Sequence, residues 1–328
     1  MEKSIKKIQY GRKKGSEEEE LVSFRLDSLD SKDFLRLKCG IERYAIEYCS
    51  NKNAIVIGDV IGTLYVWNAL NFKKVFQTSA FDFGINNIKY SSEGDSVIVA
   101  SIGFRIYTLL PSGRLKLKKT IQTTRTFSLC IIPNTRLLLT SDIIGNVNIW
   151  NMNNYSLRSR LNTNNKKLKG YAILYLEHYD LLICGFECGK IALYNVKENF
   201  AELSQITAAK EGWQMTLGYD KKLNLLLVST DTFVIKTWRI AEGKYLQYWT
   251  QFPTMLAEVY EFIPAIIDKE ECAIVTGRSC QIVILGLEHY RQDLVLKRKY
   301  SSAKILKHQK KILLGSNISN KIDIATFE

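Results

Sequence analysis

Two aspartates, Asp59 and Asp142, recur at the same place in two similar segments of the chain and are the first candidates for chemistry. A pair of carboxylates can share the acid and base roles of a catalytic site. Each of the two, however, lies in a short turn between two apolar runs, where an aspartate side chain accepts hydrogen bonds from its own backbone. The sequence therefore favours a structural role for both residues.

Other residues that could do chemistry are scattered. His178, His289 and His308 lie far apart in the sequence, and we expect none of them to act as an acid or base. Cys184 and Cys188 have a spacing that could start a metal site, but no second Cys/His pair with ligand spacing accompanies them. Phosphate-loop, nucleophile-elbow and dinucleotide-binding motifs are absent from the sequence. We therefore expect no catalysis, metal, cofactor or small-molecule substrate.

The segments around the two aspartates are near copies of each other, Gly58 to Asn68 and Ser141 to Asn151. They lie about two units of 40–45 residues apart, which is the length of a four-stranded propeller blade. A weaker copy lies between them, at Ser96 to Tyr107. The spacing therefore predicts a repeated four-stranded unit.

Pairs of apolar or alternating runs around small turns recur along the rest of the chain. They lie at residues 54–68, 96–110, 136–151, 180–196, 224–240, 272–287 and 311–327. These seven pairs predict an all-β fold, a single seven-bladed β-propeller over residues 20–328, with six or eight blades as the alternatives. The last repeat lacks its outer strand, and an extra strand pattern precedes the first repeat at residues 21–26. We predict that this N-terminal strand pairs with the C-terminal blade and closes the ring, which removes an exposed sheet edge.

This pattern resembles the WD-repeat β-propeller family over residues 20–328. The family's Trp-Asp pair has counterparts at Trp67-Asn68, Trp150-Asn151, Tyr194-Asn195 and Trp238-Arg239. The family's Gly-His pair is absent, and Ile61 and Ile144 stand where its turn aspartate would be. The resemblance implies divergent blades held mainly by apolar packing, with the four aromatic residues buried between blades.

The chain is strongly basic, with 46 lysines and arginines against 33 acidic residues and a net charge of +13. Three segments concentrate this charge without any acidic residue, residues 114–119, 158–169 and 297–311. Such a balance favours an acidic partner, either nucleic acid or an acidic protein surface. Lysines on the outer strands of a sheet also serve to block edge-to-edge pairing.

Residues 1–19 switch abruptly from basic to acidic, and we expect a disordered charged tail. The run Arg12-Lys13-Lys14 within it favours the nucleus over the cytoplasm, although short basic runs are also common in solvated tails. The seven cysteines are dispersed, as expected for free thiols in a reducing intracellular compartment. No apolar stretch is long enough to span a membrane, so we expect no membrane partner.

Two stretches are the predicted contact sites. Trp249 introduces an apolar connection between blades, predicted from Thr250 to Glu258, that contains Phe252 and Met255. Exposed aromatic clusters are disfavoured unless a partner covers them. Arg158, Arg160, Lys166, Lys167 and Lys169 run from an outer strand into a polar loop, a usual place for binding residues. By fold analogy we expect a non-enzymatic scaffold that binds other proteins in a multisubunit complex. The alternative is a nucleic-acid-binding propeller of a ribonucleoprotein or chromatin assembly.

Overall fold

The computed structural model describes twenty-six strands and three short 3-10 turns. The described residues are 35–38, 45–161, 168–208, 215–230, 234–242, 244–253, 259–267, 270–277, 282–286, 292–296, 300–306, 311–316 and 321–326. The strands of the first half are β1 (Leu35–Lys38), β2 (Ala45–Cys49), β3 (Ala54–Gly58), β4 (Thr63–Asn68), β5 (Lys74–Ser79), β6 (Asn87–Ser91), β7 (Ser96–Leu109), β8 (Leu115–Ile132), β9 (Leu137–Asp142), β10 (Val147–Asn151) and β11 (Ser156–Leu161). Those of the second half are β12 (Gly170–Leu176), β13 (Leu181–Phe186), β14 (Lys190–Asn195), β15 (Ala201–Thr207), β16 (Met215–Asp220), β17 (Leu225–Thr230), β18 (Val234–Ile240), β19 (Leu246–Pro253), β20 (Val259–Ile267), β21 (Glu270–Gly277), β22 (Ile282–Gly286), β23 (Gln292–Leu296), β24 (Tyr300–Leu306), β25 (Lys311–Ser316) and β26 (Lys321–Thr326). The 3-10 turns are η2 (Ser50–Lys52), η3 (Glu177–Tyr179) and η4 (Glu187–Gly189).

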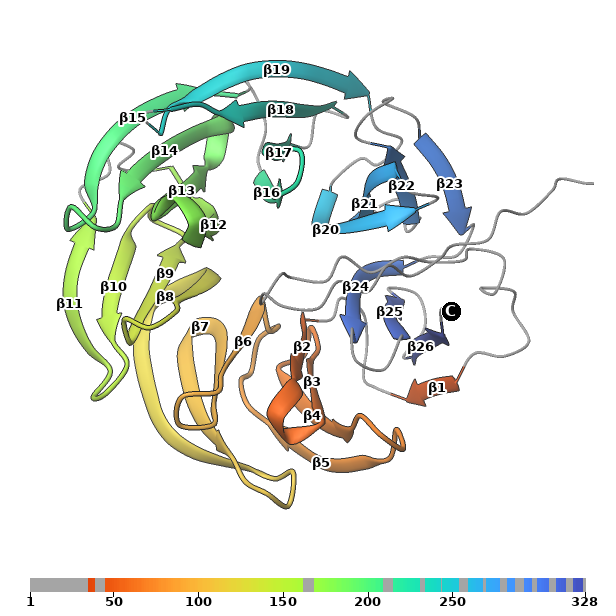
Figure 1. Cartoon of the computed structure of the whole chain (residues 1–328). Coiled ribbons are helices and arrows are strands. Elements are labelled where there is room, and N and C mark those ends of the chain that lie inside the picture. The colour runs from red at the N-terminus through yellow and green to blue at the C-terminus, as the bar shows by residue number, and fades with distance from the viewer. Residues whose placement is uncertain are drawn as a thin grey trace, which may run out of the picture.

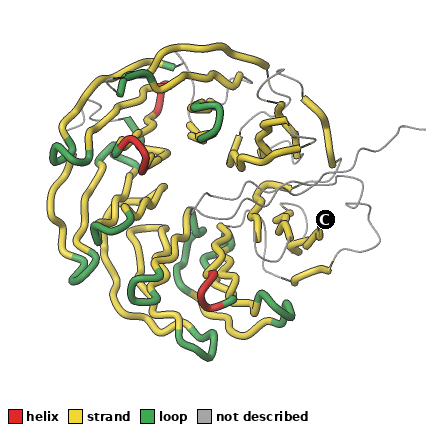
Figure 2. The backbone as a smooth tube through the Cα atoms, viewed as in Figure 1, coloured by secondary structure: helices red, strands yellow, loops and turns green. Residues whose placement is uncertain are grey.

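The strands form antiparallel sheets arranged around a common centre (Figure 1). Four of the sheets are consecutive meanders, β2 to β5, β12 to β15, β16 to β19 and β20 to β23, and the first strand of each lies nearest the centre. Short loops join the strands of the first half of the chain (Figure 2). The fold is therefore an all-β propeller, as the sequence predicts.

One sheet has six strands and covers the second and third predicted repeats. β7 doubles back, so that the N–H of Leu109 at its end donates to the carbonyl of Asp95, just before its start, at 2.8 Å. Gly103 lies at this bend with a φ of 70°, and an added Cβ there would lie 2.3 Å from the carbonyl oxygen of Ile121. β8 pairs with β7 through its first half and with β9 through its second half. The two repeats thus share β8, and the number of seven blades stays a prediction.

The last sheet joins the two ends of the described chain. β1 pairs with β26, with Leu35 opposite Ile324. The free edge of β26 is thus occupied by β1 and not by the predicted strand at residues 21–26, so that part of the prediction is wrong. Residues 21–26 lie outside the described chain. Both segments carry a strand-like apolar pattern, so the pattern alone could not separate them. Lys304 on β24 also donates to Glu47 on β2, with Nζ and Oε2 2.8 Å apart, and these contacts favour the predicted closure of the ring.

The core consists of apolar layers between neighbouring sheets. Trp67, Trp150 and Trp238 are each 7 % exposed or less, and Tyr194 is 1 % exposed. The Trp150 ring meets the edge of Phe104 from the preceding repeat, with the ring centroids 5.1 Å apart. The prediction that these aromatic residues pack between blades is confirmed.

Candidate partner-binding surface

Asp59 holds the turn between β3 and β4. Its Oδ1 accepts hydrogen bonds from the N–H groups of Ile61 at 3.1 Å and Thr63 at 2.8 Å. Its Oδ2 accepts a third hydrogen bond from the hydroxyl of Tyr65, also at 3.1 Å. Asp59 is fully buried, and its carboxylate accepts these hydrogen bonds from residues of its own hairpin.

Asp142 holds the turn between β9 and β10 in the same way. Its Oδ1 accepts from the N–H groups of Ile144 at 3.1 Å and Asn146 at 2.8 Å, and its Oδ2 accepts from the side-chain amide of Asn146 at 3.0 Å. The prediction that both aspartates bond their own backbone is confirmed.

The other candidates for chemistry stay apart in the described part of the chain. That part contains no group of three or more His, Cys, Asp or Glu side chains placed to hold a metal ion. Cys130 and Cys184 are buried, and this burial raises the pKa of Cys130 to about 11 and that of Cys184 well above its usual value. Both thiols therefore stay protonated at neutral pH, in the form that binds metals poorly. The side chain of Cys188 lies outside the described residues.

The predicted basic site divides between two sheets. Arg158 and Arg160 are exposed on β11, the outer strand of the third repeat. Lys169 immediately precedes β12 of the next sheet, where its Nζ lies 3.2 Å from Oε1 of Glu187. The hydrogen bond from Lys169 to this carboxylate raises the pKa of Lys169. Lys166 and Lys167 lie outside the described residues.

The structure adds lysines of β8 to the two arginines of β11. Lys119 Nζ donates to the carbonyl of Asn154, in the turn between β10 and β11, at 2.6 Å. Lys118 Nζ lies 5.4 Å from the centroid of the Tyr155 ring in the same region. The outer part of β8 is thus joined to the third repeat. We call Lys116, Lys118, Lys119, Arg158 and Arg160 the basic flank; all five side chains are exposed, and within the described chain none forms an ion pair.

A cleft of about 470 Å³ lies between the second and third repeats, beside the basic flank. Its lining includes Glu93, Ser96, Lys118, Arg136, Asn153 and Tyr155. Tyr155 is buried and its hydroxyl lies 3.3 Å from Oγ of Ser96. The cleft therefore joins a fixed aromatic wall to exposed cationic side chains.

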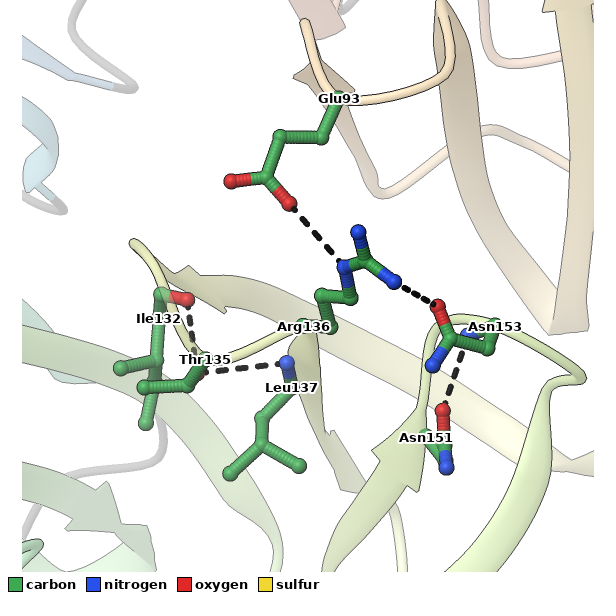
Figure 3. A network of polar contacts seen from close by, with 7 residues as sticks. All are labelled: Glu93, Ile132, Thr135, Arg136, Leu137, Asn151 and Asn153. Atoms are coloured by element: carbon green, nitrogen blue, oxygen red, sulfur yellow. Dashed lines mark hydrogen bonds and ion pairs between the residues drawn. The ribbon is translucent and has the colours of Figure 1, made fainter.

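Arg136 lines this cleft, and Figure 3 shows its guanidinium between Glu93 and Asn153, two other residues of the lining. Its Nη1 donates to Oδ1 of Asn153 at 3.1 Å, and its Nε lies 3.8 Å from Oε2 of Glu93. The Arg136 side chain is 65 % exposed and that of Glu93 is 52 % exposed. An exposed ion pair at this separation contributes little, about 0–1 kcal/mol.

The turn that carries Arg136 belongs to a series that the sequence analysis missed. In four repeats a tyrosine hydroxyl donates to an Asn or Asp side chain five residues later, and that residue has a positive φ. The pairs are Tyr48–Asn53, Tyr90–Asp95, Tyr175–Asp180 and Tyr219–Asn224. In the third repeat the same two places hold Ile131 and Arg136, and Arg136 keeps the positive φ of 54°. The five-residue spacing is visible in the sequence and could have located these turns.

The start of the predicted apolar connection is a strand. Trp249 and Phe252 lie on β19, the outer strand of its sheet, where Phe252 pairs with Ile235 of β18. The prediction of a loop from Thr250 to Glu258 is wrong at its start, because ladder pairing with β18 continues to Pro253. Met255 lies outside the described residues. Trp249 is 44 % exposed, and the guanidinium carbon of Arg239 lies 3.5 Å from the centroid of its ring.

The arrangement of the sheets and the aromatic residues buried between them define a β-propeller fold. Among solved structures, the β-propeller domain of Myceliophteria thermophila Cps50 (Swd1) is similar, with a TM-score of 0.72 and 13 % sequence identity over 90 % of this chain and 100 % of that chain. At this identity the similarity concerns the fold alone. No family model matches the sequence, and no curated protein matches it. In the described residues, no helix has the length and apolar character required to cross a bilayer.

Proposed function

We propose that this propeller is a non-enzymatic scaffold that binds other proteins of a multisubunit complex. The basic flank carries this proposal, because its five exposed cationic side chains lie on β8 and β11, which meet at the turn before β11, and have no ion-pair partner among the described residues. Exposed charge of one sign steers and orients a partner of the opposite sign. The exposed ring of Trp249 is a second contact candidate, since tryptophan and arginine are frequent anchors of interfaces.

The test is affinity purification of the full chain from cell extract, with one half of the sample treated with nuclease before mass spectrometry. We expect a fixed set of proteins to survive nuclease treatment. Charge reversal at Arg158 and Arg160 together should release members of that set, whereas reversal at Arg125, an exposed arginine outside the basic flank, should not. A co-purifying set that disappears with nuclease would contradict the proposal.

A nucleic-acid partner is the second candidate, and the same basic flank favours it. Neutralising several phosphates with lysine and arginine makes affinity fall steeply with added salt. We expect, on this alternative, that the full chain binds a labelled single-stranded RNA at low salt and that the double reversal at Arg158 and Arg160 reduces the salt slope. Negligible binding at low salt would exclude this candidate.

A further inference from the structure

We propose that the cleft between the second and third repeats binds an acidic side chain of a partner protein, and that Arg136 pairs with its carboxylate. The inference rests on the proposed scaffold function and assigns a site and a partner chemistry to it. The occupant follows from charge: Lys118 and Arg136 line the cleft, the basic flank lies beside it, and Glu93 is the one acidic side chain of its lining.

The backbone of the turn explains the positive φ of Arg136 but not the choice of arginine. In each of the first four repeats, the backbone carbonyl of the residue that matches Arg136 accepts a hydrogen bond from an N–H at the end of the second strand of the hairpin, or just after it. For Arg136 the donor is the N–H of Met152, at 2.9 Å. The hairpin therefore needs the left-handed conformation whatever the side chain. Asn and Asp adopt that conformation most easily among residues with side chains, and the structure has them at Asn53, Asp95 and Asp180.

Arginine adopts the left-handed conformation less easily than asparagine or aspartate. The side chain of Arg136 lines the cleft. A residue held in a sparsely populated backbone region is a reason to look for function. The present partners of the guanidinium are one neutral amide oxygen, on Asn153, and the distant carboxylate of Glu93. A carboxylate from a partner can replace Glu93 and accept two parallel hydrogen bonds from the guanidinium, which is a stronger arrangement.

Arg136→Asn is the sharpest variant, because it separates binding from folding. Asparagine occupies the matching places Asn53 and Asn224 with φ of 47° and 54°. The variant should therefore unfold at the same temperature as the parent or higher, while it loses the cation. Arg125→Asn is the matched control, since Arg125 is an exposed arginine whose contacts are with Asn86 and Phe127, outside the cleft.

The experiment is selection of a random 12-residue peptide display library on the immobilised full chain, followed by fluorescence anisotropy with labelled forms of the enriched peptides. We expect enriched peptides to contain Asp or Glu. Their affinity should fall about tenfold or more in Arg136→Asn, fall by a smaller factor in Arg136→Lys, and stay unchanged in Arg125→Asn. Glu93→Gln should strengthen binding severalfold, because it removes the competing carboxylate.

Three results would overturn the inference: no enriched peptides, enriched peptides without acidic residues, or affinities that Arg136→Asn leaves within twofold. Binding of a labelled 12-nucleotide single-stranded DNA that depends on Arg136, in place of peptide binding, would assign the cleft to phosphates and overturn the protein partner. The scaffold proposal is judged separately, by the nuclease-treated purification, and it survives failure at this cleft if the co-purifying proteins persist.

Discussion

The first repeat, β2 to β5, and the third, from the second half of β8 to β11, share one turn and differ in the tryptophan beside it. In the third repeat, Trp150 Nε1 donates to the hydroxyl of Thr140 at 3.0 Å. In the first, the buried Trp67 Nε1 has no hydrogen-bond partner among the described residues. The strand registers place Ile57 where the third repeat has Thr140. Asp59 and Asp142 thus hold the turn in the two repeats in the same way, while the hydroxyl partner of the tryptophan is replaced by an apolar residue in the first.

The largest expected effect concerns what the two repeats share. Asp59→Ala and Asp142→Ala each remove the acceptor of two turn N–H groups and one side-chain donor. Buried donors left without a partner cost about 1–3 kcal/mol each, and partial access to water reduces the sum. We expect each variant to lower the free energy of unfolding by about 3 kcal/mol, measured by urea denaturation.

Asp82→Ala is the matched control, because Asp82 is exposed, and it should change the free energy of unfolding by less than about 0.5 kcal/mol. A small effect at Asp59 together with a large one at Asp142 would show that the two turns are not equivalent. The shared feature of the comparison would then be geometric only.

The second prediction concerns the difference between the repeats. Thr140→Val leaves the indole N–H of Trp150 buried and unpaired, and should cost about 1–2 kcal/mol. At the matching place, Ile57→Thr and Ile57→Val remove similar volume, and only threonine offers a hydroxyl to Trp67. We expect these two variants to differ by less than about 0.5 kcal/mol, because the new hydrogen bond offsets the burial of the hydroxyl.

Urea denaturation of the three variants supplies the numbers. If the free energy of unfolding of Ile57→Thr is lower than that of Ile57→Val by the cost of a buried, unpaired hydroxyl, the indole N–H of Trp67 does not donate to the new hydroxyl. The first repeat would then be adapted to its apolar surroundings. The result would sharpen the comparison from a missing partner to a different packing solution.

The sequence predicted those features of the two repeats that depend on local pattern. The turn role of Asp59 and Asp142 and the burial of Trp67 and Trp150 follow from residue type and spacing. The cleft could not be predicted, because Arg136 and Lys118 approach each other only when two repeats pack together. β1 was missed because residues 21–26 carry a strand-like apolar pattern too, and the sequence pattern does not tell which of the two segments pairs with β26.

The predicted basic site shows the same limit of what the sequence alone can predict. The basic run that includes Lys169 was predicted as one site, yet Glu187, eighteen residues later, pairs with Lys169 and leaves the arginines of β11 on another sheet. A run of like charges in sequence says nothing of the acid that folding brings to it. The three-dimensional arrangement therefore moves the candidate site from a loop to the junction of two repeats.

The smallest expected effect compares the two ion pairs that flank the second repeat. Lys52 Nζ lies 2.7 Å from Oδ2 of Asp95, and their side chains are 24 % and 32 % exposed. Arg136 and Glu93, by contrast, are exposed, and Nε of Arg136 lies 3.8 Å from Oε2 of Glu93. The hydrogen bond from Lys52, more than that from Tyr90, lowers the pKa of Asp95. A carboxyl whose pKa is lower in the folded state stabilises the fold above its unfolded pKa, about 3.9, and loses this as pH falls through the folded pKa.

We therefore expect the free energy of unfolding, measured between about pH 6 and 3, to fall less steeply in Asp95→Asn than in the parent chain. Glu93→Gln should change the free energy of unfolding at neutral pH by less than about 0.5 kcal/mol, because an exposed and distant pair is screened by water. Asp180, whose pKa is lowered chiefly by Lys197, should supply part of the slope that remains. If Glu93→Gln lowers the free energy of unfolding at neutral pH as much as Asp95→Asn does, Arg136 is already engaged with Glu93, and an incoming carboxylate would have to break a strong pair to reach it.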